Sequence, residues 1–599
     1  VDRGVPEVWG SVYDVRDLLD SSVKLMDGKS SIRELLGLKI AGIEKKLQNP
    51  DLNAEDRKDL EKKLADQKSK RNSEFIAVYE NNEELHRVID MGLKLEGTPK
   101  NTSEHAAGVV ICRKVLSDNV PLARNGDDIV TQFDMKEVEA VGMLKMDFLA
   151  LTTLTDMQNT LQYIKENYGI DIDFHEIGYD VPEAYQLISS GDTDAVFQLE
   201  QGGMKKFMKD LQPNCLEDLI AGISLYRPGP MDFIPKYIQN KHHPEGIVYD
   251  TPYLEPILKN SYGVIVYQEQ VMQIFQHLAG YSLGQADLVR RAMAKKHLDE
   301  LMAQKNKFIY GDIENGGNIT GCVSKGIPAD VAAKIFSDME SFASYAFNKS
   351  HAAAYAVVAY RTAYLKYFYP KEFLAGILND RLDKIEEISK YIAYMKERGI
   401  EVLQPDINRS KTIFAVEGKG LRIGLGALRG IGIEAIESVI SERDEHGEFA
   451  DFADFNVRCA KYINKRIVES LIYAGAFDCF GYPRSVFIAV YEEVLARVTA
   501  MEKQKSGNQI SLFGNIIEEE KVVIDYPVIP EYDQAEKLSL EKSVLGVYVS
   551  GHPFEKYAPY FKDRTFNCSM LQYEEDEETG EKKYTEIESG QQVTMGGMI

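Results

Sequence analysis

The sequence lacks any closely spaced pair of cysteines. Its six cysteines are scattered along 599 residues, and none belongs to a CxxC pair. Structural zinc sites and disulfide-stapled domains both depend on such pairs. Their absence argues against a zinc site, and it indicates a reducing, cytosolic setting in which thiols stay free.

Long apolar runs and positive charge are scarce as well. No apolar run reaches the roughly 18 residues that a membrane span needs, and no signal peptide is recognisable, so we expect no membrane partner. The formal net charge of −24 argues against nucleic acid as a partner of the whole surface. The charge is uneven, however, because residues 287–307 carry six basic and three acidic side chains, whereas residues 574–578 are all acidic. Local patches decide phosphate binding.

One aspartate stands inside an otherwise apolar run. The stretch GMLKMDFLAL, residues 142–151, predicts a short buried strand that contains Asp147. Lys145 lies two residues earlier, so on a strand both side chains point to the same face. A carboxylate beside a core is costly unless it is paired or holds a metal. The run therefore makes Asp147 a candidate functional residue and leaves its partners open.

Hydrophobic patterning predicts several domains, about three to five for this length. Along the chain we expect a helical region over 1–98 with a charged helical hairpin over 40–71, strands joined by loops over 99–155, a large mostly helical region over 156–400, a smaller helical unit over 415–485, a polar linker over 501–515, and a return to strands. The broad class is therefore multidomain α+β.

Two helical stretches collect cations and aromatic rings. Residues 280–296, GYSLGQADLVRRAMAKK, place Arg290, Arg291 and Lys295 on a predicted helix, where arginine forks suit phosphate oxygens. The alternative is a solvated basic helix face. Residues 344–370 put an Asn-Lys-Ser-His cluster and flat tyrosine rings at a helix start, which suits base stacking. The alternative there is a core helix with tyrosines at helical spacing.

Two further patterns indicate DNA and protein partners. The Gly430-Ile431-Gly432 turn opens a helix near Ile433, and such a turn with free amides can grip a phosphate backbone as in a helix-hairpin-helix. An ordinary glycine turn is the alternative. Residues 463–481 repeat the combination of helix and turn, which suggests a tandem pair. The segment QISLF, 509–513, exposes apolar residues in the polar linker, either for a partner or for a contact back onto the chain.

Taken in order, these motifs resemble the alpha (polymerising) subunits of bacterial DNA polymerase III, the C family of DNA polymerases. The resemblance runs from about residue 75 to the end. The matching stretches are LEGTPKNTSEHAAGVVI, VTQFD, LKMDFLAL, DAVFQLEQGGMKKF, SLYRPGP, GVIVYQEQVMQI, GYSLGQADLVRRAMAKK, FNKSHAAAYA, QPDIN and QISLFG.

The resemblance implies a replicative DNA polymerase that adds dNTPs to a primer 3′-hydroxyl by two-metal chemistry with Mg²⁺. It implies a thumb with a charged helical insertion over 1–98, the second part of a polymerase-beta-like palm over 99–156, fingers over 157–405, tandem helix-hairpin-helix motifs over 406–485, a linker with a clamp-binding peptide over 486–530, and a connector with the start of an OB domain over 531–599.

The resemblance also implies roles for single residues. Asp147 would be the catalytic metal ligand. The nucleotide would be bound by Lys145, Arg227, Arg290, Arg291, Lys295, Tyr345, Asn348, Lys349 and His351, and DNA by Gly430, Gly432, Lys465 and Arg466. Gln509, Leu512 and Phe513 would bind the sliding clamp (beta). The resemblance also implies two further kinds of partner, a proofreading exonuclease subunit and clamp-loader subunits. It implies a location in the bacterial cytoplasm, associated with the nucleoid.

The sequence departs from the family before Asp147. The family's first two metal-binding aspartates and its metallophosphatase-like (PHP) domain find no counterpart, and residues 1–70 fit poorly. Asp171 and Asp173 alternate as metal ligands on a strand would, but they follow Asp147, so we do not expect them to bind metal. We expect a fragment that is inactive alone. A non-catalytic DNA- and clamp-binding relative is the alternative, and a repair factor with helix-hairpin-helix motifs ranks last.

Overall fold

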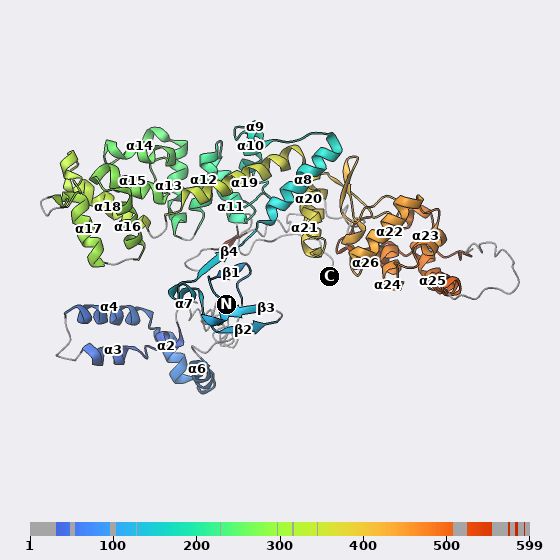
Figure 1. Cartoon of the computed structure of the whole chain (residues 1–599), viewed down its shortest axis with the longest axis horizontal. Helices are drawn as coiled ribbons and strands as arrows, with labels where there is room; N and C mark the ends of the chain where they lie inside the picture. The colour runs from blue at the N-terminus through green and yellow to red at the C-terminus, as the bar shows by residue number, and fades with distance from the viewer. Residues whose placement is uncertain are drawn as a thin grey trace. The chain divides into compact units, whose positions relative to one another are not determined.

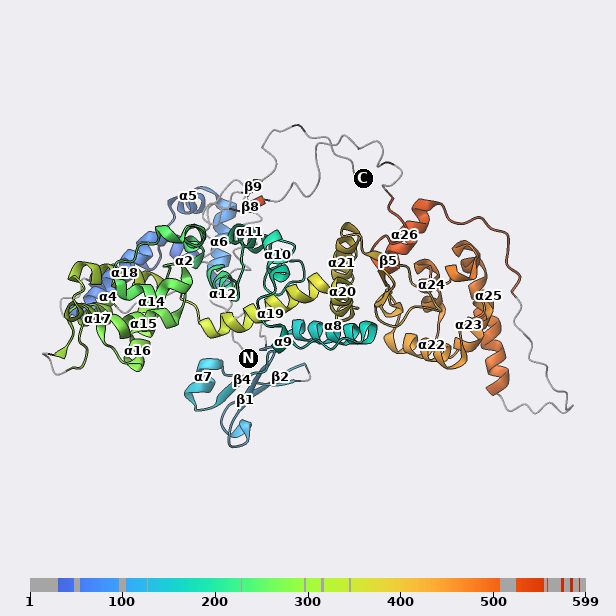
Figure 2. The same ribbon diagram turned by 90° about the horizontal axis from the view of Figure 1, so that it is seen from above.

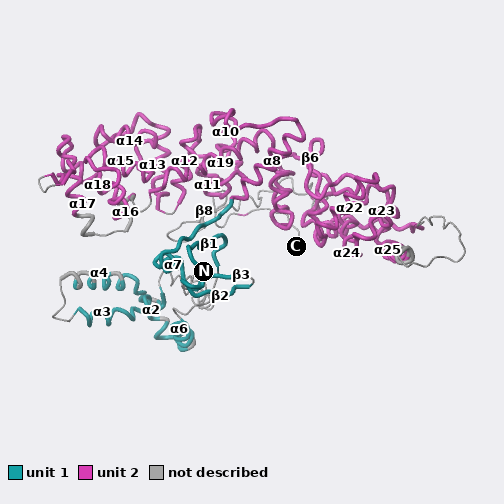
Figure 3. Tube along the Cα trace, viewed as in Figure 1, with its two compact units in different colours: residues 1–150 teal, residues 151–599 magenta. Residues whose placement is uncertain are grey.

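The computed structural model divides into two compact units, residues 1–150 and 151–599 (Figure 3). The structure describes residues 31–47, 54–95, 104–126, 128–227, 229–295, 298–313, 317–343, 346–506, 524–553, 557, 573–575, 582–584 and 592. The described residues are mostly helical, with small sheets, which confirms the α+β class.

The described residues between 31 and 95 of unit 1 form five helices. They are α2 (Ile32–Leu35), α3 (Ile40–Leu47), α4 (Ala54–Lys70), α5 (Ser73–Asn81) and α6 (Glu83–Leu95). α3 and α4 pack side by side (Figure 1), as the predicted charged hairpin requires. Glu34 on α2 accepts hydrogen bonds from Gln67 and Lys70 on α4, so polar contacts join α2 to α4. A small apolar core of Ile32, Leu35, Phe75 and Ile89 lies between α2, α5 and α6.

The described residues between 104 and 150 form four strands and one α-helix. They are β1 (Gly108–Ile111), β2 (Leu122–Asn125), β3 (Asp128–Thr131), α7 (Met135–Ala140) and β4 (Leu144–Asp147), with β1 antiparallel to β4 and β2 to β3. The strand at Asp147 is thus confirmed, but its predicted burial is wrong, because Leu144, Met146 and Phe148 are exposed. Helix α7 was not predicted. Its capping box, Asp134 with Glu137, was the available signal.

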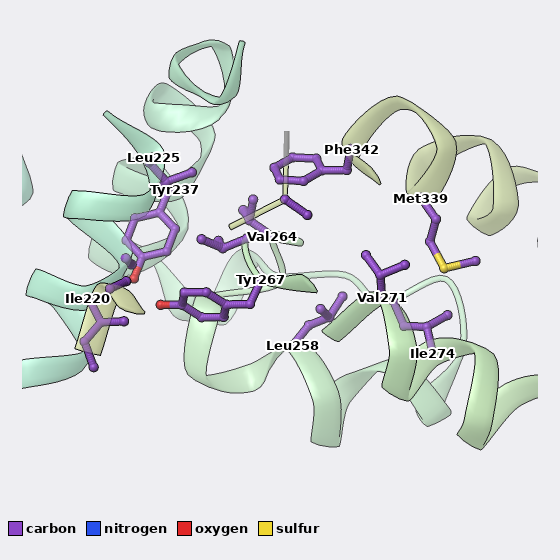
Figure 4. Close-up of a cluster of buried hydrophobic side chains, with 14 of the residues drawn as sticks. Ile220, Leu225, Tyr237, Leu258, Val264, Tyr267, Val271, Ile274, Met339 and Phe342 are labelled. Carbon is purple, nitrogen blue, oxygen red and sulfur yellow. The ribbon is translucent and has the colours of Figure 1, made fainter. Parts of the chain in front are cut away.

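Unit 2 begins with a helical region, most of which is built around one large apolar core. Its helices are α8 (Thr152–Tyr168), α9 (Phe174–Ile177), α10 (Pro182–Ser190), α11 (Gly202–Leu211), α12 (Leu216–Leu225), α13 (Ile234–His242), α14 (Glu255–Leu258), α15 (Gln268–Ala279), α16 (Leu283–Lys295), α17 (Leu298–Tyr310), α18 (Ala329–Ala343) and α19 (Lys349–Phe368). Figure 4 shows the rings of Tyr237, Tyr267 and Phe342 among aliphatic side chains of this core. The predicted mostly helical region is confirmed.

The long helix α19 connects this core to the next one. Its first half packs on α10 and α12, with Ala352, Ala356 and Tyr360 buried in the first core, and Leu365 near its end belongs to the second. In both views α19 lies beside α12 and leads into α20 (Figures 1 and 2). A single rigid helix therefore carries residues of both cores.

The second core of unit 2 joins helices to a three-stranded sheet, and it also buries Met157 and Ile164 of α8 and Phe174 of α9. Its elements are α20 (Pro370–Asn379), α21 (Ile385–Glu397), β5 (Glu401–Leu403), β6 (Ala415–Glu417), β7 (Gly420–Arg422), α22 (Ile433–His446), α23 (Phe452–Cys459), α24 (Lys465–Ala474), α25 (Arg484–Ser506) and α26 (Gln534–Leu545). In the sheet β7 is central, parallel to β5 and antiparallel to β6. Two further strands, β8 (Tyr573–Glu575) and β9 (Lys582–Tyr584), pair with each other. In the part of the chain that the structure describes, no helix has the length and apolarity to cross a membrane.

A buried ion pair ties α12 to α13 inside the first core. The Lys241 ammonium lies 2.9 Å from the Asp218 carboxylate, and both side chains are almost fully buried. Lys241 also donates hydrogen bonds to the backbone carbonyls of Leu211 and Gln212, and the Asn214 amide donates to Asp218. The pair therefore joins the end of α11 to α12 and α13.

We predict that Asp218→Ala destabilises this region by about 3–5 kcal/mol, because it leaves the Lys241 ammonium buried without its counter-charge. Amide hydrogen exchange at α12 and α13 measures this as a loss of local opening free energy. Asp171→Ala is the control. Asp171 pairs with Lys165 in an exposed position, so its loss is expected to cost no more than about 0.5 kcal/mol. Equal effects of the two substitutions would contradict the prediction.

Candidate functional site

Asp147 lies at the end of β4 on the same face as Lys145, as predicted. The Lys145 ammonium is 2.9 Å from Asp147 Oδ1. Hydrogen bonding from Lys145 holds the pKa of the Asp147 carboxyl below its usual value, so this carboxylate is ionised at neutral pH. The Asp147 side chain is 45% exposed, which means that it faces a partner or solvent and not a core.

A histidine that the sequence did not single out completes this arrangement. His105 Nδ1 is 3.7 Å from Asp147 Oδ1 and accepts a hydrogen bond from the Ala107 amide. Gly108 on β1 gives both side chains room, because a Cβ there would come within 2.7 Å of the Lys145 side chain and 2.9 Å of His105 and would displace them. A cavity of about 670 Å³ is lined by His105, Gly108 and Lys145, among other residues of unit 1.

The carboxylates of the described residues do not gather into a metal site. No group of three or more His, Cys, Asp or Glu side chains there is placed to hold an ion. Residues 170–173 are not a strand, although Asp171 and Asp173 alternate there. Asp171 pairs with Lys165, and Asp173 caps α9 by accepting a hydrogen bond from the His175 amide. Both carboxylates thus have structural partners.

Helix α16 carries the predicted arginine pair. Asp287, one turn earlier, was not singled out by the sequence, but its carboxylate lies 2.8 Å from both Arg290 and Arg291. Hydrogen bonding from Arg290 holds the pKa of the Asp287 carboxyl below its usual value. Lys295 is the last residue of α16, and its side chain lies outside the described residues.

The predicted cluster at the start of α19 is held by a carboxylate of α15. Asn348 is the N-cap and accepts a hydrogen bond from the His351 amide. Both oxygens of Glu269 accept from the Lys349 amide at 3.1 Å, and one also accepts from the Asn348 side chain. The Lys349 ammonium lies over the Tyr267 ring, 5.2 Å from its centroid. Glu269 therefore fixes the first residues of α19, and the Lys349 ammonium lies on the face of the Tyr267 ring.

A row of rings runs along one face of the first turns of α19. Ring centroids are 5.4 Å apart between Phe347 and His351, 4.2 Å between His351 and Tyr355, and 5.0 Å between Tyr355 and Phe197 of the α10–α11 loop. The Arg227 guanidinium lies over Phe347, 3.6 Å from the ring centroid. Partial burial lowers the pKa of Arg227. The structure thus brings Arg227, His351 and Tyr355, one of the tyrosines expected to stack on bases, into one row. Its other members, Phe347 and Phe197, were not singled out from the sequence.

The glycine turn and the basic residues predicted to bind DNA meet beside α22 and α24. Gly430 has a φ of +83°, and a Cβ there would come within 2.7 Å of the Arg466 side chain. Gly432 is the N-cap of α22, which begins at Ile433 as predicted. Lys465 and Arg466 open α24, where Lys465 forms an ion pair with Glu492. The Arg466 side chain is exposed.

Some predicted residues lie outside the described residues, namely Tyr345, Gln509, Leu512 and Phe513. Their roles stay predictions. Asp147 and Lys145 belong to unit 1, whereas the arginines of α16, the start of α19 and the glycine turn belong to unit 2.

Comparisons with known proteins give three family matches. Residues 22–150 match the bacterial DNA polymerase III alpha NTPase domain, residues 153–316 match the bacterial DNA polymerase III alpha subunit finger domain, and residues 399–487 match a helix-hairpin-helix motif. The helix-hairpin-helix prediction is therefore confirmed at the level of the motif.

Individual relatives agree with these matches. The DNA polymerase III subunit alpha of Thermus aquaticus is 42% identical over 81% of this chain and 39% of its own length. That of Aquifex aeolicus is 38% identical over 94% of the chain and 45% of its length. That of Pasteurella multocida is 41% identical over 81% and 42%. The chain thus spans less than half the length of these relatives, and over most of its own length it is similar to a part of bacterial DNA polymerase III alpha subunits.

Proposed function

We propose that the chain is the DNA- and nucleotide-binding part of a replicative, template-directed DNA polymerase. The observation that carries this proposal is the start of α19. In the described part of the chain neither Arg227 nor Lys349 has a carboxylate partner for its charged group, and each cation lies over an aromatic ring. Cations held on rings, beside a row of further rings, suit a ligand that combines phosphates with flat bases.

In this proposal the parts have separate tasks. Arg290, Arg291 and Lys295 bind the triphosphate of the incoming dNTP, and the ring row around His351 contacts bases. The Gly430 turn with Arg466 grips duplex DNA through its backbone, because amides at a helix start and an arginine fork both suit phosphates. The linker peptide Gln509, Leu512 and Phe513 binds the sliding clamp. The partial polymerase-beta-like palm, the tandem repeat, the OB start and the domain limits stay predictions of the resemblance.

Mg²⁺ does not fit the described residues by themselves. Two-metal phosphoryl transfer requires several carboxylates around a pair of ions, and Asp147 is a single carboxylate whose oxygen already faces Lys145. We therefore propose that this chain binds primer-template DNA and dNTPs without joining them, and that further aspartates of a parent protein complete the metal site. A proofreading exonuclease subunit and clamp-loader subunits are the expected further partners.

The second candidate is a non-catalytic relative that binds DNA and the clamp. It is favoured by the Lys145–Asp147 ion pair, since a carboxylate whose charge is neutralised by an ammonium needs no metal. The two candidates differ in whether a longer parent chain carries two aspartates on a strand before residue 1.

We predict that this chain shifts primed template DNA in a gel and does not extend the primer with all four dNTPs and Mg²⁺. The physical reason is that the cations proposed to bind phosphate are present in the chain, whereas the described residues place no group of carboxylates that could hold the metals. Parallel gel-shift and extension assays on the same preparation measure both properties.

Asp147→Ala is the control for this prediction. Extension that disappears with the substitution would show a complete site within the chain and would overturn the proposal of missing ligands. Extension that persists would come from a contaminating polymerase. Absence of a shift at low salt would contradict the proposed DNA binding itself.

We predict that Arg466→Ala weakens duplex binding for all sequences alike and makes the dependence of log K on log salt shallower by about 1. Each lost phosphate contact releases about one counterion fewer, so the slope counts such contacts. Fluorescence anisotropy with a labelled duplex at several salt concentrations gives the slope.

Arg497→Ala serves as the matched control, because Arg497 is an exposed arginine of α25 that pairs with Glu493 and lies outside the glycine turn. Its removal changes the net charge equally and should leave the slope unchanged. A change of equal size in both variants would assign the effect to total charge and not to the turn.

A further inference from the structure

The two arginines of α16 share a single carboxylate. Arg290 donates from Nε and Nη2 to Asp287 Oδ1 at 3.1 and 2.8 Å, and Arg291 Nη2 lies 2.8 Å from Asp287 Oδ2. Each carboxylate oxygen thus serves a different guanidinium. The arrangement is local to one helix, since Asp287 precedes the arginines by three and four residues, the spacings at which helical side chains meet.

A phosphate would need the same donors. The guanidinium fork presents its N–H groups to carboxylate and phosphate oxygens in the same geometry. Arg290 and Arg291 therefore cannot give these N–H groups to a triphosphate while Asp287 holds them. Asp287 and a bound triphosphate compete for the pair.

The two arginines differ in how easily each can move away from the Asp287 carboxylate. The Arg290 side chain is 16% exposed, whereas that of Arg291 is 65% exposed. Burial fixes Arg290 near its present position, while Arg291 can swing to a ligand at little cost. The Asp287 side chain is itself only partly exposed. A ligand that captures Arg291 first and then Arg290 would displace the carboxylate in two steps.

We infer that Asp287 is an internal substitute for the nucleotide's phosphates. It holds Arg290 and Arg291 ordered and neutralised while the site is empty, and the incoming triphosphate displaces it. Asp287 thereby sets the affinity for the nucleotide. This inference rests on the proposed function, because it takes the α16 arginines as the triphosphate site. The opposing view is that Asp287 orients the arginines for the phosphate and stays bound to them in the complex.

The two views predict opposite signs for Asp287→Asn. The asparagine keeps the shape but loses the charge, so the competing pair is weakened. If Asp287 competes, the Kd for a triphosphate falls about three- to tenfold, in line with the modest strength of partly exposed ion pairs. If Asp287 orients the arginines, the Kd rises.

The experiment titrates the full chain with a fluorescent dATP analogue and, separately, with inorganic tripolyphosphate. The variants are wild type, Asp287→Asn and Asp250→Asn. Asp250 pairs with Lys334 elsewhere in unit 2 at 2.6 Å, so its substitution removes the same charge from another exposed pair. Circular dichroism melting verifies that the variants are folded.

A lower Kd for both ligands in Asp287→Asn, with Asp250→Asn within about twofold of wild type, supports the inference. An unchanged or higher Kd in Asp287→Asn, with wild type binding the nucleotide, overturns the inference alone and leaves the proposed function standing. If no variant binds either ligand, both the inference and the proposed nucleotide site at α16 are wrong. The gel-shift assay described above then tests DNA binding independently.

Discussion

The buried ammonium of Lys366 is the contact on which the ring row depends. Its side chain is 3% exposed, and it donates to the backbone carbonyls of Asp192 and Asp194 at 2.8 Å and to the Asp192 carboxylate at 3.0 Å. Burial lowers the pKa of Lys366, which the Asp192 charge opposes. A buried charge without such partners costs several kcal/mol, so the α10–α11 loop cannot leave α19 without exposing or neutralising it.

This anchoring holds a loop whose backbone is strained. Ala195 and Gln198 have φ values of 64° and 63°, a left-handed conformation that costs non-glycine residues on the order of 1–3 kcal/mol each. The Phe197 amide between them donates to Thr362 on α19 at 3.2 Å. The result is that the Phe197 ring meets Tyr355. The row of rings therefore exists because a buried lysine and a threonine of one helix hold a distant loop in an unfavourable conformation.

The helices that carry cations could be predicted from the sequence, because their signals are local. The glycine turn fixed the start of α22 at Ile433, and apolar spacing placed Arg290 and Arg291 on α16. The partners of these groups divide into two cases. Asp287 could have been found in the same way, because it precedes the arginines by three and four residues on one helix. Glu269 could not, because it lies on α15 and accepts hydrogen bonds from Asn348 and Lys349, which are 79 and 80 residues away in sequence. Phe197 entered the row through a loop whose path depends on contacts about 170 residues away in sequence.

The errors at β4 have a different cause. An apolar run shows that a strand can form, but it does not show whether another element packs over the strand. The burial predicted for residues 142–151 was therefore wrong. Helix α7 was missed although its signal was local, since the capping box of Asp134 and Glu137 opens its six residues. The neighbouring elements thus decided the outcome at β4, whereas a local signal was overlooked at α7.

The two units differ most in the size of core that supports each candidate site. β1 and β4 form a two-stranded ribbon beside a core of only Val120, Val138 and Met143, and such a ribbon is marginal in water. The arginines of α16 and the start of α19 instead stand on helices packed in an extensive apolar core. Packing therefore fixes the positions of the α16 arginines and of the start of α19, which we propose as the phosphate site, while the position of Asp147 rests on its neighbours Lys145 and His105.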